Sequence, residues 1–198
     1  MHANSILIFE KYALKYFRPN MRILEIGPDK FPSSYKTIVG IDSINWDTLD
    51  IYKNPNLTYS ATEELHYPIQ DNQYDIILSG NVLEHVPKVW IWIKELARIC
   101  KEGGLIITVN PVYLGYHPHP VDCWRAFPEG MKALYEEAGI KVILLLYETL
   151  DVLNPRYTLR MENSLCSKTR FIVKMMLHRL NFPVKRLQTY DTITIGKK

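Results

Sequence analysis

The sequence is poor in features that would place it in a specialised class of protein. Its three cysteines, Cys100, Cys123 and Cys166, are widely separated and form no Cys-x-x-Cys pair. A scattered, odd-numbered set of this kind indicates neither a disulfide framework nor a zinc site. The longest apolar stretches, such as residues 142–147, are far too short to cross a bilayer. We therefore expect no membrane span.

The N-terminal segment also lacks the pattern of a secretory signal. No basic region precedes the apolar run at residues 6–9, and Glu10 and Lys11 follow that run at once. Internal repeats and low-complexity linkers are absent as well. We expect a single domain over residues 1–198, because 47% hydrophobic and 23% charged residues are ordinary globular values. The scattered cysteines favour a reducing, cytoplasmic setting.

Charge is distributed unevenly along the chain, although the formal net charge is only +3. Residues 151–198 hold ten lysines and arginines against three acids, whereas the rest holds 14 against 18. We expect a basic, partly helical insertion at about residues 155–186. It could face an anionic partner such as a phosphorylated carrier, a nucleic acid or a membrane surface. The alternative is an ordinary solvated helix face.

Apolar runs alternate with amphipathic segments along most of the chain. We predict strands at residues 22–27, 38–42, 57–61, 74–80, 105–110, 140–147 and 190–195. Helices are predicted from a cap at Asn4 or Ser5 to Pro19, from residue 89 to a stop at Gly103-Gly104, and over 128–139. The ten residues 28–37 leave too little room for a full crossover helix. This order predicts an α/β fold: one Rossmann-like, doubly wound, seven-stranded sheet, mostly parallel, with an antiparallel C-terminal strand.

Three of the predicted strands end in polar or glycine residues suited to binding a ligand. The first ends at Glu25-Ile26-Gly27, and the fourth continues into Ser79-Gly80-Asn81. Asp42 ends the second, 17 positions after Glu25. An acid at that distance is placed to accept hydrogen bonds from a ribose diol. The ordered set predicts a nucleoside-containing ligand at the carboxyl edge of the sheet.

These segments give the chain its family resemblance. The matching stretches are ILEIG at 23–27, GID at 40–42, EEL at 63–65, YDIILSGNVLEHV at 74–86 and GGLIITVNP at 103–111. The chain resembles the class I S-adenosylmethionine-dependent methyltransferases, and within them the methyltransferase type 11-like enzymes associated with polysaccharide and glycan biosynthesis. The resemblance is firmest over residues 22–139. It implies S-adenosylmethionine as cofactor and S-adenosylhomocysteine as product.

The resemblance also implies which residues contact the cofactor. They are Glu25, Gly27 and Pro28 beside the methionine portion, Asp42 and Ser43 at the ribose, Ala61 and Thr62 at the adenine, and Ser79, Gly80, Asn81 and His85 toward the sulfonium. His85 would either stack near the cofactor or cap the turn before Pro87. The chain departs from the family pattern in two places. Pro28, Asp29 and Phe31 replace the usual glycine loop, and Ala61 stands where an acid is common.

A second pattern follows the fifth predicted strand. His117, Pro120, Asp122 and Arg125 match an H-x-x-P-x-D-x-x-R stretch of methyltransferases encoded with glycan enzymes. The resemblance implies His117, Asp122 and His119 as candidate general bases and Tyr116, Trp124 and Arg125 as substrate contacts. The structural alternative is that Asp122 pairs with Arg125 or caps the next turn.

Together these features predict an O-methyltransferase that acts on a sugar or glycan intermediate. The methyl group would move by in-line displacement, with a His/Asp general base removing the hydroxyl proton. Methylation of another small molecule or of RNA is one alternative, and a noncatalytic binding module with the same fold is another. Asp, Glu and His do not cluster at metal-ligand spacing, so we expect no metal.

Overall fold

The computed structural model describes residues 2–61, 65–118, 120–150 and 189–198. The strands in chain order are β1 Arg22–Ile26, β2 Asn45–Asp50, β3 Tyr59–Ser60, β4 Tyr74–Gly80, β5 Cys100–Tyr113, β6 Lys141–Glu148 and β7 Tyr190–Lys197. The helices are α1 Ala3–Tyr12, α2 Ser34–Val39, α3 Val89–Ile99 and α4 Pro128–Glu137, with 3₁₀ turns η1 Leu14–Tyr16 and η2 Leu83–His85. The predicted basic insertion at 155–186 lies outside the described residues.

All seven strands form one sheet in the order β3-β2-β1-β4-β5-β7-β6. Neighbours from β3 to β5 run parallel, whereas β7 is antiparallel to both β5 and β6. This arrangement confirms the predicted mostly parallel, doubly wound sheet with an antiparallel C-terminal strand. The strand order reverses direction between β1 and β4, and that reversal opens a crevice at the carboxyl ends of these strands.

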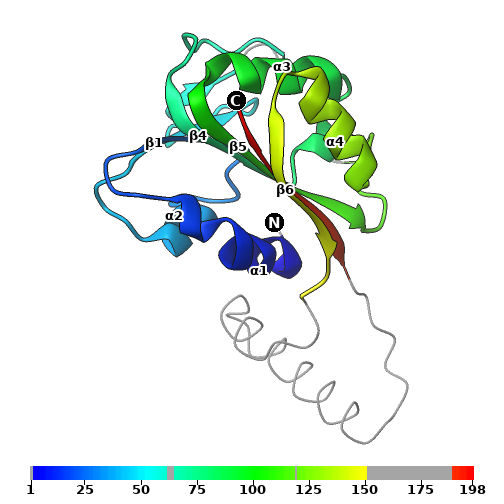
Figure 1. Ribbon diagram of the computed structural model, residues 1–198. Helices are drawn as coiled ribbons and strands as arrows, with labels where there is room; N and C mark the ends of the chain where they lie inside the picture. Colours follow the sequence, from blue (N-terminus) through cyan, green and yellow to red (C-terminus); the bar gives the residue numbers. More distant parts are fainter. Residues whose placement is uncertain (1, 62–64, 119, 151–188) are drawn as a thin grey trace, which may run out of the picture.

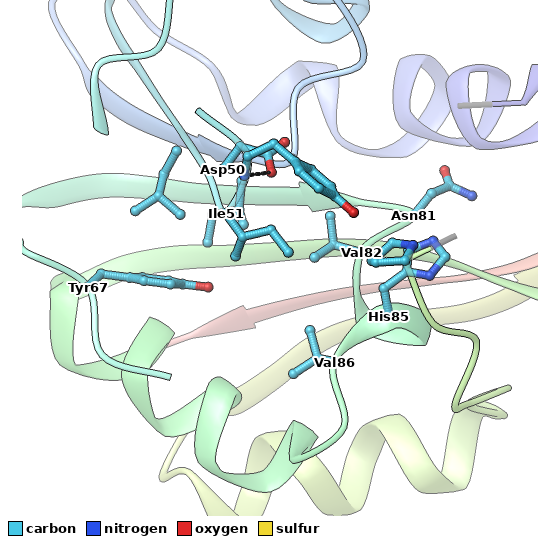
Figure 2. Close-up of a pocket in the computed structure, with 12 residues that line it drawn as sticks. Asp50, Ile51, Tyr67, Asn81, Val82, His85 and Val86 are labelled. Atoms are coloured by element: carbon cyan, nitrogen blue, oxygen red, sulfur yellow. Dashed lines mark hydrogen bonds between the residues drawn. The ribbon is translucent and has the colours of Figure 1, made fainter. Parts of the chain in front are cut away.

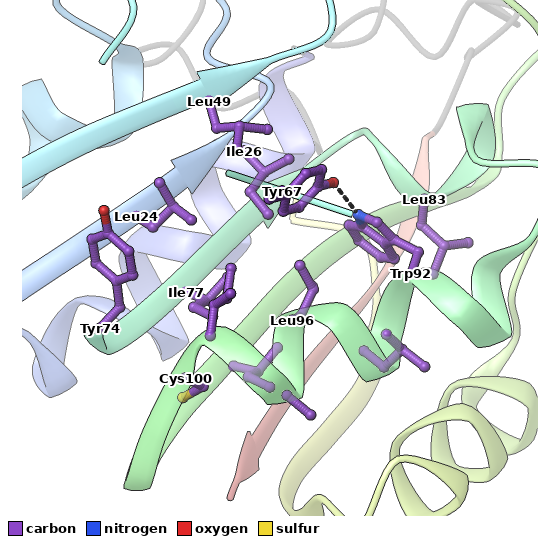
Figure 3. Close-up of a cluster of buried hydrophobic side chains, with 14 of the residues drawn as sticks. Leu24, Ile26, Leu49, Tyr67, Tyr74, Ile77, Leu83, Trp92, Leu96 and Cys100 are labelled. Atoms are coloured by element: carbon purple, nitrogen blue, oxygen red, sulfur yellow. Dashed lines mark hydrogen bonds between the residues drawn. The ribbon is translucent and has the colours of Figure 1, made fainter. Parts of the chain in front are cut away.

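Helices cover both faces of the sheet, and each face buries its own apolar cluster. Figure 1 shows α1 and α2 on one side of the sheet and α3 and α4 on the other. On the α1 side, Phe9 and Tyr35 pack over the sheet with ring centroids 4.3 Å apart. On the α3 side, Trp92 is fully buried and its Nε1–H donates to the Tyr67 hydroxyl at 2.8 Å (Figure 3). Burial on both faces explains why β4 is a continuous apolar run.

The predicted strand at 38–42 is wrong. Residues Ser34–Val39 form α2, whose first turn is capped by the Ser33 hydroxyl as it accepts from the Lys36 amide at 3.0 Å. Gly40 then ends the helix in the left-handed conformation, with φ of 58°. The strand that follows is β2, which begins only at Asn45. The connection from β1 is therefore long enough to include a short helix.

Two predicted helix boundaries are also wrong. His2, rather than Asn4 or Ser5, occupies the position before α1, and both of those polar residues are fully buried within the first turn. The helix at 89–99 does not run to Gly103-Gly104, because β5 begins at Cys100 and passes through both glycines. A Cβ at Gly104 would lie 2.8 Å from the Cys100 sulfur and 3.0 Å from the Asp75 carbonyl oxygen, so close packing explains this glycine. Among the described residues, no helix has the length and apolar character needed to cross a membrane.

Candidate active site

A pocket of about 180 Å³ lies at the carboxyl edge of β1, β2 and β4. Figure 2 shows Asp50 and Ile51 above it, Tyr67 at one end, and Asn81 and His85 at the other. Its lining consists of Ile26, Gly27, Leu49, Asp50, Ile51, Tyr52, Tyr67, Asn81, Val82, His85, Val86 and Pro120. The pocket thus occupies the crevice that the strand order creates between β1 and β4.

Gly27 brings the end of β1 into close contact with the loop after β4. Its φ is +70°, and a Cβ there would lie 2.5 Å from Val82 Cγ2. The Gly27 amide donates to the Leu49 carbonyl at 2.9 Å, which ties this turn to β2. Both the backbone conformation and the space therefore require glycine at the position predicted from sequence. Pro28, its neighbour, is not among the lining residues.

Asp50 is the acidic residue that reaches the pocket, and the sequence prediction missed it. It ends β2, and its Oδ1 accepts from the Tyr52 amide at 3.0 Å (Figure 2). Asp42, predicted for this task, precedes β2 and is therefore at the amino end of that strand, and neither it nor Ser43 lines the pocket. The misplaced strand put Asp42, and not Asp50, at the predicted end of the second strand. The signal that could have found Asp50 is the sequence Asn-Trp-Asp-Thr-Leu-Asp, in which an acid closes a partly buried strand.

Glu25 is buried in the protein rather than directed to the pocket. Its side chain accepts hydrogen bonds from the Ser33 hydroxyl and from Trp46 Nε1, the latter at 2.9 Å. Burial raises the pKa of Glu25 from 4.5 to about 7, although the two hydrogen bonds act in the opposite direction. Glu25 therefore joins β1, the α2 cap and β2. Glu25 was predicted to lie beside the cofactor, but it is not among the residues that line the pocket.

The remaining predicted cofactor residues divide into two groups. Asn81 and His85 line the pocket, and Asn81 takes the left-handed conformation with φ of 58°. Ser79, Gly80 and Ala61 are buried and do not line it. A Cβ at Gly80 would overlap the Tyr35 ring, so this glycine serves packing between β4 and α2. Thr62 lies outside the described residues.

Asp29 lies in the segment that replaces the usual glycine loop after β1, and it holds the start of α2. Its carboxylate accepts from the Ser34 amide at 2.9 Å and from the Ser34 hydroxyl at 2.7 Å. The first turn of α2 is therefore held by Asp29 and by the Ser33 cap together. The departure from the family pattern at 28–31 thus builds the start of the crossover helix.

The loop after β5 folds against η2 at the mouth of the pocket. The Cys123 amide donates to the Glu84 carbonyl at 2.7 Å, and Trp124 Nε1 donates to the Val86 carbonyl at 2.9 Å. Pro120 of the same loop lines the pocket. These contacts bring the H-x-x-P-x-D-x-x-R segment over the end of β4. The predicted placement of this loop is therefore confirmed, except for His119, which is outside the described residues.

Asp122 holds this loop together through an ion pair and a backbone hydrogen bond. Its side chain is 2% exposed and pairs with the Arg125 guanidinium, whose Nη2 lies 2.7 Å from Oδ2. The His117 amide also donates to Oδ2 at 2.9 Å. The Arg125 hydrogen bonds are the main reason that the pKa of Asp122 falls to about 2. The structure therefore contains the Asp122–Arg125 pair foreseen as the structural alternative, while the roles of Asp122 as a base and of Arg125 as a substrate contact stay predictions.

Tyr116 and Trp124, predicted to contact substrate, differ in their surroundings. Tyr116 is 78% exposed on the same loop. Trp124 packs edge-on against Trp90, with ring centroids 6.2 Å apart, and lines a separate surface groove with Phe127 and Leu134. Neither lines the pocket beside β1. Of the two, Trp124 is the one fixed by a hydrogen bond.

Glu84, His85 and His117 form a cluster that no spacing in the sequence predicts. One possible ligand atom from each lies within 4.8 Å of the others. Glu84 is 1% exposed, and apart from its own backbone amide nothing in the described part of the chain hydrogen-bonds to its carboxylate oxygens. Burial raises the pKa of Glu84 to about 7, although the hydrogen bond from its own backbone amide and the charge of Arg125 lower it, and Asp122 and Asp191 raise it further. The trio was missed because Glu84 and His85 are on η2 whereas His117 is on the later loop.

The N-terminal helix adds polar residues that sequence reasoning also missed. The Ser5 hydroxyl donates to Asn81 Oδ1 at 2.9 Å, which ties α1 to the pocket. Asn4 Nδ2 donates to the fully buried Asp191 at 2.8 Å, and His2 Nε2 lies 3.1 Å from the same carboxylate. The start of α1 therefore supports the end of β4 and the start of β7.

Sequence comparison identifies methyltransferase relatives over part of the chain. A model described as "Methyltransferase domain" matches residues 31–108. An uncharacterized methyltransferase of Mycobacteroides abscessus is 41% identical over 63 residues, which is 32% of this chain and 24% of that protein. The matched segment thus spans about a quarter of the length of this relative. The domain model's match at residues 31–108 includes α2, β2 and β4, and so much of the pocket.

Structure comparison extends the likeness to the whole sheet. Phosphoethanolamine N-methyltransferase 2 of Haemonchus contortus, in complex with S-adenosylmethionine, superposes with a TM-score of 0.61 at 12% identity, covering 98% of this chain and 52% of that chain. The [4+2]-cyclase SpnF superposes with a TM-score of 0.64 at 11% identity, covering 98% and 79%. At these identities the likeness shows the fold alone. The chain is thus similar in sequence to a methyltransferase domain over residues 31–108, and its fold is similar to that of a methyltransferase and of a cyclase.

Proposed function

We propose that the chain transfers a methyl group from S-adenosylmethionine to a hydroxyl group of a sugar or glycan intermediate. The observation that carries the methyl-transfer part is the meeting of Gly27, Asp50 and Asn81 in one pocket, at the point where the strand order reverses. The matched methyltransferase domain covers Asp50 and Asn81. Ligands of doubly wound sheets bind at this place because the adjacent loops diverge there.

The pocket residues fit the cofactor by their chemistry. Asp50 ends β2 with a carboxylate that can accept hydrogen bonds from the two ribose hydroxyls. Ile51 and Tyr67 supply apolar surface for the adenine ring. The exposed backbone at Gly27 and the side chain of Asn81 border the side where the methionine portion would be held. Asp50 takes the role that the sequence assigned to Asp42.

The chain has to align the acceptor and remove a proton. When bound, S-adenosylmethionine supplies a methyl group on a positively charged sulfur. Alignment of reactants alone contributes on the order of 7 to 11 kcal/mol to lowering the barrier. Because Asp122 is paired with Arg125, the proposed general base among the described residues is His117, whose side chain is 35% exposed beside the pocket loop. A base in hydrogen-bond reach adds roughly 100-fold to 10,000-fold.

The choice of a sugar acceptor rests on the resemblance of the loop at 117–125 to glycan-associated methyltransferases. Two exposed aromatic residues shortly before this loop, Tyr113 at the end of β5 and Tyr116, are compatible with that choice, since aromatic faces stack well on sugar rings. The phosphoethanolamine N-methyltransferase neighbour makes an amine the first competing acceptor to test. The neighbour SpnF is a cyclase, so this fold does not by itself imply methyl transfer. Methyl transfer by this chain therefore has to be measured.

Incubation with cofactor carrying a labelled methyl group tests the proposal. The panel should contain nucleotide sugars, short glycans, phosphoethanolamine and a structured RNA. We expect label in at least one sugar or glycan, attached through oxygen. Label only in the amine or only in RNA would replace the proposed acceptor while keeping methyl transfer. Tight cofactor binding with no labelled product from any acceptor would favour a noncatalytic module.

A further inference from the structure

We infer that Glu84, His85 and His117 form a binding site for one divalent transition-metal ion beside the proposed cofactor pocket. The three side chains offer ligand atoms that lie within 4.8 Å of one another. Two imidazoles and one carboxylate are a donor set that Zn²⁺, Mn²⁺ and Fe²⁺ all accept in proteins. The site itself rests on the side-chain geometry, and only its role in catalysis rests on the proposed function.

The buried carboxylate of Glu84 is the first observation that points to a cation. The side chain is 1% exposed, and apart from Glu84's own backbone amide no described residue hydrogen-bonds to either oxygen. His85 Nε2 lies 3.8 Å from Glu84 Oε1, which is too far for a hydrogen bond. Buried polar atoms without partners are rare and costly in folded proteins. An ion between these two groups would supply the missing partner.

The hydrogen bonds of the two histidines are the second observation. His85 Nδ1 contacts the Val121 carbonyl, and His117 Nδ1 lies 3.0 Å from the Gly115 carbonyl. A carbonyl oxygen only accepts, so Nδ1 carries the proton in each ring and Nε2 keeps its lone pair. Metal-binding histidines usually donate their other ring N–H to a carbonyl or carboxylate in this way. Both rings are therefore held in the tautomer that a metal requires.

The surroundings of the trio also favour a cation. Asp122 lies 3.4 Å from His117 Nδ1, and Asp122 and Asp191 are close enough to act electrostatically on Glu84. Arg125 is the opposing charge, but it is paired with Asp122. Ligand bonds of about 2.1 Å would draw the three donor atoms together, which requires only small side-chain movements. His85 also lines the pocket, so the remaining coordination positions can face an acceptor there.

The ion would change the task proposed for His117. With Nε2 coordinated, His117 holds the metal and does not take the acceptor proton. A metal ion lowers the pKa of a bound hydroxyl or water strongly, so an acceptor hydroxyl in an open position would ionise more easily and release its proton to solvent water.

Metal titration of the full chain tests the site. After treatment with a chelator, the protein is titrated with Zn²⁺ and Mn²⁺ by calorimetry and with Co²⁺ by visible absorption. We expect one ion per chain for at least one of these metals, and Co²⁺ absorption typical of nitrogen and oxygen ligands. Glu84→Gln and His117→Ala should each weaken binding by on the order of 100-fold or more, since loss of even an outer partner typically costs 10- to 100-fold. His117→Ala is informative if the Glu84 variant does not fold, because His117 is partly exposed.

His66→Ala is the matched control. His66 also neighbours a buried glutamate, with Nδ1 3.7 Å from Glu95 Oε1, but among the described residues it belongs to no cluster of three. We expect this variant to bind the ion as the wild type does. No ion bound by the wild type, or equal binding by the Glu84 and His117 variants, would overturn the inference. Titration of the same samples with S-adenosylhomocysteine separates the two proposals, because ion binding without cofactor binding would contradict only the proposed function.

Discussion

The Gly27 amide donates a hydrogen bond to the Leu49 carbonyl oxygen at 2.9 Å, which joins the turn after β1 to the end of β2. This contact places Asp50, the next residue of β2, beside the glycine turn in the same pocket. The cofactor site proposed for the chain depends on this register. It also explains why the acid at the end of β2, and not the acid before it, faces the crevice.

Replacement of Gly27 should damage both stability and the pocket. In Gly27→Ala, the alanine backbone would have to keep φ near +70°, which L residues rarely adopt. Its Cβ would also have to displace Val82 Cγ2, which would lie only 2.5 Å away. We expect the free energy of unfolding to fall by about 1 to 3 kcal/mol. Urea denaturation measures this change.

Gly130→Ala is the matched control for Gly27. Gly130 lies inside α4, has no positive φ, and an added Cβ would meet nothing within 4 Å. Alanine favours a helix interior over glycine, so stability should rise by roughly 0.5 to 1 kcal/mol. Equal losses at both positions would contradict the role given to the Gly27 turn.

Asp122→Asn should act through the loop and not through proton transfer. The Asn side chain keeps the shape but loses the charge that pairs with Arg125, so we expect a loss of about 1 to 3 kcal/mol in unfolding free energy. Glu137→Gln is the control, because its pair with Lys94 is exposed and contributes little. An Asp122→Asn protein of unchanged stability and cofactor affinity, with turnover abolished, would instead identify Asp122 as the base.

Glu25 should make the stability of the protein depend on pH. Its pKa rises from 4.5 to about 7 in the folded state, so folding favours the protonated form. Unfolding free energy should therefore be fully retained below pH 4.5 and should decrease as the pH rises toward 7, by roughly 3 kcal/mol in all. Asp29 strengthens the effect and Lys36 weakens it.

Glu25→Gln isolates this contribution. Glutamine keeps an oxygen that can accept from Ser33 and Trp46 but cannot ionise. The variant should match the wild type at pH 4 and exceed its stability at pH 8, as measured by denaturation at a series of pH values. Parallel pH profiles for the two proteins would show that Glu25 is not the cause.

Sequence reasoning predicted most of the sheet because most strands carry unambiguous signals. β4 is a continuous apolar run closing on Gly80, and β7 alternates around Ile193 and Ile195. Sequence reasoning placed β2 wrongly, because the apolar residues at 38–41 belong to the end of α2 and the turn after it. Short apolar runs do not distinguish helix from strand by periodicity alone. Here the Ser33 cap and the left-handed Gly40 mark the two ends of a helix, so the segment between them is helical and not a strand.

The site was predictable where it follows strand ends and was missed where it depends on distant segments. Gly27, Asn81 and His85 were predicted because each follows a recognisable strand. Asp42 was chosen in place of Asp50 because the strand before it was misplaced. The approach of His117 to Glu84 depends on the hydrogen bonds of the loop to η2, which leave no pattern in the sequence.

Calorimetric titration with S-adenosylhomocysteine tests the central claim most directly, with Asp50→Asn compared against Asp42→Asn. Loss of a charged acceptor to the ribose hydroxyls is worth about 1.5 to 3 kcal/mol, so Asp50→Asn should bind on the order of 10- to 100-fold more weakly. Asp42→Asn should bind as the wild type does, because Asp42 precedes β2 and does not line the pocket. Full affinity in Asp50→Asn with a loss in Asp42→Asn, or no binding by the wild type, would contradict the account.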